Sequence, residues 1–226
     1  MGRGALLFDL DGTLTEPREG ITRCLRFALE RAGASPPLEA DLSQWIGPPL
    51  HESLRVLLGP AREHLVASAL SDYRERYASL GIFENAACPG ILQALESLKK
   101  AGWALFVATS KPTVFARRIV QHFDFLPHFS GVYGSELSGE RSDKAELIAY
   151  LLREEGIPAE SAVMIGDRLH DVAGARSNGV RAIGVSWGYG SREELVSAGA
   201  TVICDSVAEL VALLGNAERA SPDAVG

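Results

Sequence analysis

Five short apolar runs, interleaved with helical patterns, most constrain how this 226-residue chain can fold. Their lengths and flanking turn residues predict buried strands at 5–10, 103–108, 131–134, 162–165 and 181–185. The segments around them predict helices at 91–101, 114–122, 144–155 and 171–178, then a last small strand at 201–204 and a helix at 207–214. Such alternation indicates an α/β fold, a doubly wound parallel sheet with helices on both faces.

The segment between the first two apolar runs departs from this alternation. Residues 18–83 contain only helical patterns, at 20–33, 50–58 and 61–78, with a rigid Trp-Ile-Gly-Pro-Pro turn at 45–49. We therefore predict an α/β core formed by residues 1–17 and 84–226 and an inserted, all-helical cap domain at 18–83. Residues 216–226 are polar and rich in small side chains, which predicts a flexible tail.

The composition of the chain indicates which kinds of partner and which cellular compartment to expect. Lys and Arg number 22 against 29 Asp and Glu, a net charge of −7 that disfavours nucleic acid. The sequence contains neither a secretion signal at its start nor an apolar run long enough to span a membrane. Three widely spaced cysteines, Cys24, Cys88 and Cys204, favour a reducing compartment. We expect a cytoplasmic protein that binds neither nucleic acid nor membrane and works as a monomer or a homodimer.

Carboxylates follow two of the predicted strands. Asp9 and Asp11 end the first apolar run, and Asp167 and Asp171 follow the run at 162–165. The carboxyl ends of parallel strands meet at one edge of a sheet, so these four side chains should gather there. Clustered carboxylates raise one another's pKa unless a cation lies among them. Their all-oxygen character predicts Mg²⁺ rather than zinc.

Donors for a phosphoryl group lie at the same predicted edge. Thr109 and Ser110 end the run at 103–108, and Lys144 begins a helix between the two acidic segments. Hydroxyl, ammonium and loop N–H groups can bind phosphate oxygens in an otherwise acidic site. Together with the acids and a metal, they indicate phosphoryl transfer.

Four motifs in order resemble those of the haloacid dehalogenase superfamily of phosphatases. They are DLDGTLT at 9–15, VATSK at 107–111, the single Lys144 and GDRLHD at 166–171. The match spans nearly the whole chain and implies a Rossmann-like core. A helical cap after the first motif resembles the phosphoglycolate phosphatase-like group. YRERY at 73–77, GERSDKAEL at 139–147 and WGYGSREEL at 187–195 are most similar to its 5′-nucleotidase-like branch.

The resemblance assigns the acidic residues to roles. It implies that Asp9 is the nucleophile that forms an aspartyl-phosphate, and that Asp11 acts first as general acid and then as general base. Mg²⁺ would be held by Asp9, the backbone carbonyl of Asp11, and Asp167, while Asp171 would orient the waters of the metal.

The resemblance also implies that Thr109, Ser110 and Lys144 bind the transferring phosphoryl group. Relatives often carry proline after the lysine, whereas Ala145 stands here. Lys111, followed by Pro112, is a rival for this lysine. Because Lys111 follows the second motif, we keep Lys144 as the phosphate ligand, with Asp143 as a candidate ion-pair partner.

Residues of the predicted cap are candidates for substrate selection. The turn that contains Trp45 and Gly47 is where relatives usually approach the leaving group. Tyr73, Arg74 and Tyr77 lie at helical spacing, which fits either packing between helices or substrate selection.

The roles of two further core segments are less directly indicated by the sequence. Arg168 and His170 could reach substrate or form surface salt bridges. The Gly188-Tyr189-Gly190 segment does not complete a GxGxxG motif, and we interpret it as a surface loop after the fifth strand.

The leading hypothesis is a Mg²⁺-dependent phosphomonoesterase of a small phosphorylated metabolite, most similar to enzymes that act on nucleoside 5′-monophosphates. Phosphoglycolate phosphatase is the alternative. A phosphomutase would share the aspartyl-phosphate chemistry. A phospho-receiver switch is disfavoured by Asp11, since a switch must avoid rapid hydrolysis, and by the helical insertion.

Overall fold

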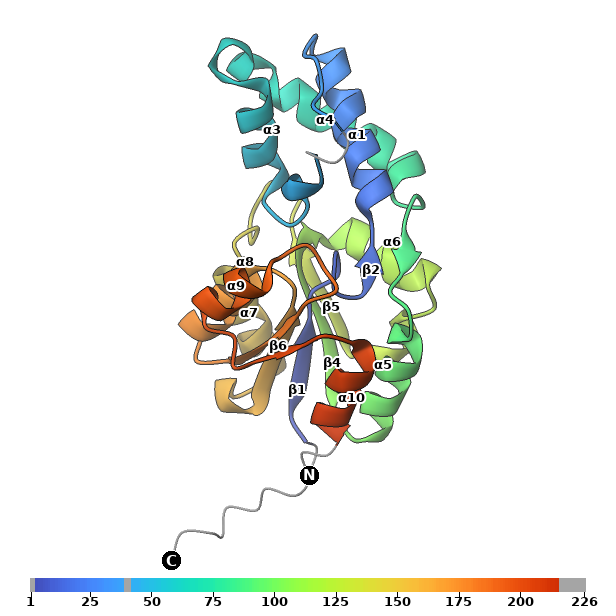
Figure 1. Cartoon of the computed structure of the whole chain (residues 1–226), viewed down its shortest axis with the longest axis vertical. Coiled ribbons are helices and arrows are strands. Elements are labelled where there is room, and N and C mark those ends of the chain that lie inside the picture. Colours follow the sequence, from blue (N-terminus) through green and yellow to red (C-terminus); the bar gives the residue numbers. More distant parts are fainter. Residues whose placement is uncertain (1–2, 39–41, 216–226) are drawn as a thin grey trace, which may run out of the picture.

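A six-stranded parallel sheet forms the core of the computed structural model, which describes residues 3–38 and 42–215 (Figure 1). The strand order is β5-β4-β1-β6-β7-β8. The strands are β1 (Ala5–Phe8), β4 (Ala104–Pro112), β5 (Gly131–Ser135), β6 (Ala162–Gly166), β7 (Arg181–Val185) and β8 (Val202–Cys204). The predicted tail at 216–226 lies outside the described residues.

Helices cover both faces of this sheet because the strands are apolar on both sides. Leu6 and Phe8 of β1 belong to one hydrophobic cluster, and the alternate residues Ala5 and Leu7 belong to the other. The first cluster contains residues of α5 (Ile91–Lys100), α6 (Thr113–His122) and α10 (Val207–Gly215). The second contains residues of α7 (Lys144–Glu155), α8 (Leu169–Ser177) and α9 (Arg192–Ala198). The predicted doubly wound sheet is confirmed.

The described part of the segment 18–81 lies beyond the carboxyl ends of the central strands, at the top of Figure 1. Its elements are α1 (Arg18–Arg31), the 3₁₀ turns η1 (Ser43–Trp45) and η2 (Pro60–Leu65), α3 (Leu50–Leu58), α4 (Val66–Arg76) and the π-helical turn η3 (Tyr77–Gly81). We refer to these elements as the cap. They join the core through a short antiparallel pair, β2 (Thr15–Glu16) and β3 (Ala86–Ala87).

The helix predicted at 61–78 is divided into three parts. Pro60 starts the 3₁₀ turn, Arg62 has non-helical dihedral angles that interrupt the turn internally, and α4 begins after it at Val66. At the other end the π turn brings Gly81 against α1, where a Cβ added to Gly20 would lie 2.1 Å from the Gly81 carbonyl oxygen. Because Gly20 and Gly81 have no side chains, the backbones of the first and last helical segments of the cap can touch where they cross.

An ionic cluster connects the last cap turn to the chain that returns to the core. Glu84 accepts from Arg76 at 2.8 Å and from Arg23 at 2.9 Å. The Arg76 and Glu84 side chains are 16% and 21% exposed, so the pair is shielded enough to stabilise this junction.

Several elements differ from the predictions. β1 ends at Phe8 rather than at 10, so Asp9 already belongs to the loop. β4 continues to Pro112 after a register shift beyond Thr109. The short helix α9 was not predicted. In the described part of the chain, no helix is long and apolar enough to cross a membrane.

Candidate active site

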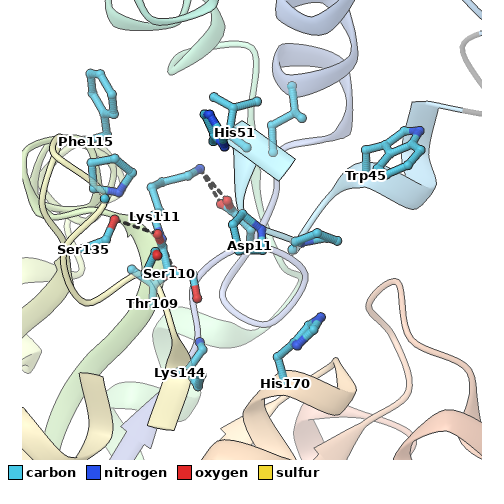
Figure 2. Close-up of a pocket in the computed structure, with 18 of the residues that line it drawn as sticks. Asp11, Trp45, His51, Thr109, Ser110, Lys111, Phe115, Ser135, Lys144 and His170 are labelled. Atoms are coloured by element: carbon cyan, nitrogen blue, oxygen red, sulfur yellow. Dashed lines mark hydrogen bonds and ion pairs between the residues drawn. The ribbon is translucent and has the colours of Figure 1, made fainter. Parts of the chain in front are cut away.

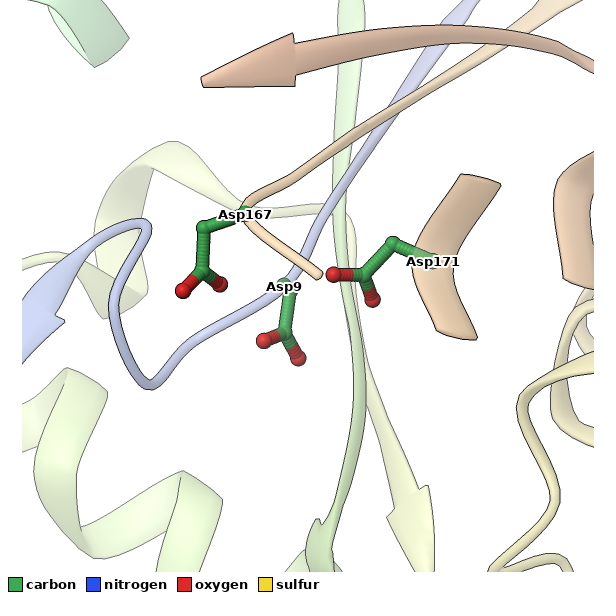
Figure 3. Close-up of side chains that lie close together, drawn as sticks. All are labelled: Asp9, Asp167 and Asp171. Atoms are coloured by element: carbon green, nitrogen blue, oxygen red, sulfur yellow. The ribbon is translucent and has the colours of Figure 1, made fainter. Parts of the chain in front are cut away.

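Three buried carboxylates meet at the carboxyl end of the sheet (Figure 3). Asp9 follows β1, Asp167 follows β6 and Asp171 lies in the first turn of α8. The parallel pairing of β1 with β6 places Phe8 opposite Ile165, and the Asp9 N–H donates to the Ile165 carbonyl at 2.9 Å. Asp9, Asp167 and Asp171 each offer one oxygen within 4.8 Å of the others. The predicted convergence of distant acids is therefore present.

Lys144 neutralises part of this cluster. Its ammonium lies 2.9 Å from Asp9 Oδ1 and 2.7 Å from Asp171 Oδ1, and it donates to the Ala108 carbonyl at 2.9 Å. Burial alone would lower the pKa of Lys144, but Asp171 and Asp9 raise it above its ordinary value, so the ammonium stays charged. The suggested pairing with Asp143 is wrong, because Asp143 instead caps α7 by accepting from two backbone N–H groups.

A second lysine, whose pairing the sequence did not reveal, holds Asp11 (Figure 2). The Lys111 ammonium lies 2.6 Å from each carboxylate oxygen of Asp11 and 2.7 Å from the Tyr77 hydroxyl of the cap. Burial raises the pKa of Asp11 above its ordinary value, although Lys111 opposes this shift. The sequence held one signal of this pairing: Lys111 directly follows the polar residues Thr109 and Ser110, at the edge of the sheet where the acidic residues were predicted to gather.

The loop after β7 is part of the site, so its interpretation as a surface loop is wrong. The Tyr189 N–H donates to Asp167 Oδ2 at 2.7 Å. A Cβ added to Gly188 would lie 2.3 Å from the same oxygen, and so would one added to Gly12, whose φ is +86°. These two glycines leave the space in which the Asp167 carboxylate lies.

The donor set fits a hard divalent cation. Asp9, Asp167 and Asp171 offer oxygen ligands, which are the ligands Mg²⁺ prefers. The two lysines of the site leave two of the four negative charges of Asp9, Asp11, Asp167 and Asp171 uncompensated. Burial raises the pKa of Asp167, as expected for a carboxylate whose counter-charge is incomplete. One divalent ion would complete this balance.

A cavity of about 170 Å³ lies between these groups and the cap. The core contributes Asp9, Asp11, Thr109, Ser110, Lys144 and Asp171, and the cap contributes Trp45, Gly47, Tyr73 and Arg74. Asp167 is fully buried and is not among the lining residues. His51, Phe115, Ser135 and Glu136 also line the cavity and were not predicted (Figure 2 labels the first three).

The strand end at Thr109 is shaped by local hydrogen bonds. Thr109 is buried, and its hydroxyl accepts from the Lys111 N–H at 3.3 Å, across the register shift in β4. The Ser135 hydroxyl donates to the Ser110 carbonyl at 2.8 Å. Both predicted phosphate donors are thus held at the cavity.

The cap and core side chains whose roles the sequence left open line the cavity, namely Tyr73, Arg74, Tyr77, Arg168 and His170. Tyr73 stacks on Tyr77 with ring centroids 5.6 Å apart, so Tyr73 both packs within the cap and faces the cavity. Arg74 donates to the Leu137 carbonyl of the core at 2.8 Å. Arg168 and His170 line the cavity from the core side, and burial lowers the pKa of His170.

Comparison with known proteins identifies the family. The family described as haloacid dehalogenase-like hydrolase matches residues 6–185, and the chain belongs to it. The protein is thus a hydrolase of this family. The solved structure of a predicted phosphatase from Clostridium acetobutylicum superposes with a TM-score of 0.88 at 40% identity and covers 93% of this chain and 97% of that one.

Several named proteins are similar to most of this chain. A Pseudomonas aeruginosa protein named 5′-nucleotidase is 50% identical over 205 residues, which cover 91% of this chain and 92% of the relative. Tyrosine-protein kinase PtkA of Mycobacterium tuberculosis is 40% identical over 200 residues, 88% of this chain and 67% of that protein. Phosphoglycolate phosphatase 1 of P. aeruginosa is 27% identical over 213 residues, 91% of this chain and 78% of that protein. The predicted resemblance is confirmed.

Proposed function

We propose that this hydrolase is a Mg²⁺-dependent phosphomonoesterase that works through an aspartyl-phosphate on Asp9. The observation that carries the proposal is the position of Asp9 at a cavity, beside Lys144 and within a cluster of carboxylates suited to a cation. A lysine and a cation beside Asp9 lower the repulsion between its carboxylate and an anionic substrate.

The proposed reaction has two displacements. A carboxylate oxygen of Asp9 attacks phosphorus, the ester P–O bond breaks, and Asp11 gives its proton to the leaving oxygen. A water molecule then attacks the phosphorus of the aspartyl-phosphate and gives a proton to Asp11, and the bond to Asp9 breaks with release of phosphate. Burial favours the protonated form of Asp11 that the first step needs, whereas Lys111 favours the ionised form that the second step needs.

The phosphoryl group would be bound by the chain's own donors. Thr109 and Lys144 line the cavity together with Ser110 and would donate to the phosphoryl oxygens. Asp9, Asp167 and the backbone carbonyl of Asp11 would hold Mg²⁺. When bound, the ion supplies positive charge that offsets the charge of the phosphoryl group.

Nucleoside 5′-monophosphates are the proposed substrates. The similarity to the P. aeruginosa 5′-nucleotidase supports this choice, and so does the aromatic wall formed by Tyr73, Tyr77 and Phe115, whose rings contact one another. Such a wall packs well against a flat base. Arg74 lines the same cavity and has N–H groups beyond the one bonded to Leu137, which suits an acceptor on the base. 2-Phosphoglycolate, the alternative, would leave the aromatic wall without a partner.

Phosphate release from nucleoside 5′-monophosphates, 2-phosphoglycolate and sugar phosphates, with Mg²⁺ or with chelator, tests the proposal. We expect nucleotides to be preferred, chelator to abolish turnover and Asp9→Asn to abolish it as well. Asp124→Asn is the matched control, because Asp124 is exposed and its left-handed conformation suits asparagine. Retained activity in Asp9→Asn would refute the mechanism. A preference for 2-phosphoglycolate would make that compound, and not a nucleotide, the proposed substrate. Transfer of phosphate from ATP to a tyrosine peptide, without release to water, would refute the hydrolase.

A further inference from the structure

Arg168 connects the core to the cap directly beside the carboxylate cluster. It follows Asp167 in the chain and precedes α8, and its side chain is 15% exposed. Nη1 donates to the carbonyl of Ile46 in the cap at 2.6 Å, and Nε donates to Glu194 of α9 at 2.9 Å. The Arg168 guanidinium therefore forms an ion pair with Glu194 within the core and a hydrogen bond to the main chain of the cap at Ile46.

On the cap side, the loop at 45–49 is shaped to receive this guanidinium. The Ile46 side chain is buried within the hydrophobic core, which fixes the backbone whose carbonyl accepts from Arg168. The next residue, Gly47, has a φ of +105°, and a Cβ added there would lie 3.2 Å from Arg168 Nη1. Gly47 thus meets both a conformational and a steric requirement of the contact. The same loop lines the cavity through Trp45, Gly47 and Pro48.

On the core side, Glu194 holds Arg168 in place. Glu194 Oε1 accepts from Arg168 Nε and also from the Leu169 N–H, at 2.8 Å. The Arg168 N–H in turn donates to Asp171 Oδ2 at 3.1 Å. The guanidinium is therefore anchored by the turn that carries the carboxylates, and the docked loop takes its position from that turn.

We propose that Arg168 is a positioning residue that seats the 45–49 loop over the leaving group of the substrate. The inference rests on the proposed phosphomonoesterase and adds to it a determinant of leaving-group binding. Arginine is required because Nε and Nη1 donate in two directions at once, to Glu194 and to Ile46, whereas a lysine ammonium at the end of a flexible stem does not reproduce this planar fork.

Kinetics of Arg168→Met and Arg168→Lys with a nucleoside 5′-monophosphate test the proposal. Loss of a buried hydrogen bond from a charged donor should raise KM by about tenfold or more in both variants. Inhibition by inorganic phosphate, which lacks a leaving group, should change less than about twofold, and so should the Mg²⁺ concentration for half-maximal activity. Arg153→Met is the matched control, because Arg153 is exposed and pairs only with Glu154 among the described ion pairs.

Hydrogen exchange gives a readout that does not depend on turnover. Amides of residues 43–50 should exchange faster in Arg168→Met than in the parent, whereas those of β6 should not change. Gly47→Ala, which disturbs the same contact from the cap side, should produce the same rise in KM and the same local exchange. This second variant keeps the test informative if one substitution impairs folding.

Three results would overturn the inference. A parallel rise in KM and in the inhibition constant of phosphate would place Arg168 in phosphate binding, and unchanged exchange at 43–50 would show that the loop does not depend on it. An unchanged KM together with faster exchange would show that the loop does not determine leaving-group binding. If the parent protein itself released no phosphate, the proposed function would be refuted instead. The comparison of the parent with Asp9→Asn detects that case separately, because it does not involve Arg168.

Discussion

Replacement of Lys144 by methionine should destabilise the metal-free protein strongly. Lys144 is 5% exposed at its side chain, and its partners Asp9 and Asp171 are 10% and 2% exposed. Removal of the ammonium leaves two buried carboxylates without their cation, a change that costs about 3–5 kcal/mol in buried pairs. At about 2–4 °C per kcal/mol for a chain of this size, the melting temperature in chelator should fall by about 6–20 °C.

Magnesium should recover part of this loss. An ion at the carboxylates supplies the counter-charge that Lys144 no longer provides, so Mg²⁺ should stabilise Lys144→Met more than the parent, an effect whose measurement does not depend on turnover. Urea unfolding followed by circular dichroism, with Mg²⁺ and with chelator, measures both effects. Lys99→Met is the control, since Lys99 is exposed and donates only to the Pro127 carbonyl among its described hydrogen bonds. A loss no larger than that of Lys99→Met, or an equal effect of Mg²⁺ on parent and variant, would refute the reasoning.

Three further predictions concern the surroundings of the site. Gly188→Ala would place a Cβ 2.3 Å from Asp167 Oδ2, so the Mg²⁺ concentration for half-maximal activity should rise about tenfold in titrations. The hydrogen bond from Arg76 lowers the pKa of Glu84, so the pair stabilises the fold above the ordinary carboxyl pKa and this stability is lost as pH falls. Glu84→Gln should therefore cost about 1 kcal/mol near neutral pH, and in urea unfolding this cost should disappear only as pH falls through the lowered pKa of Glu84. Burial raises the pKa of Cys88 to about 12, so iodoacetamide should modify Cys88 only after unfolding, by mass spectrometry.

The bounds of two helices whose ends carry strong sequence signals were predicted to the exact residue. The helix at 144–155 has Asp143 as its N-cap and Gly156, at a φ of +62°, as its C-cap. The helix at 50–58 is bounded by Pro49 and Gly59. These residues determine helix ends through local hydrogen bonds and backbone conformation, which a single sequence records.

Features that depend on contacts distant in sequence were not predictable. Lys111 lies 100 residues from Asp11 in the sequence, and its ammonium meets that carboxylate just beyond the register shift in β4. Tyr189, whose N–H contacts Asp167, lies in a segment that does not complete a GxGxxG motif, so no local pattern indicated this contact. The acids converge as predicted because neighbouring parallel strands fix where their ends lie, whereas loops after those ends take their paths from tertiary packing.

The position of β1 has a consequence for synthesis of the chain. β1 pairs with residues 104–107 on one side and with 162–165 on the other. The strand that carries Asp9 therefore leaves the ribosome before either of its neighbours, and it is paired on both sides only after residues 162–165 have followed. The helices of the cap are consecutive in sequence and can pack much earlier. A nascent chain that ends before residue 162 thus leaves at least one edge of this apolar strand unpaired and the carboxylate cluster incomplete, and is the stage of synthesis most exposed to aggregation.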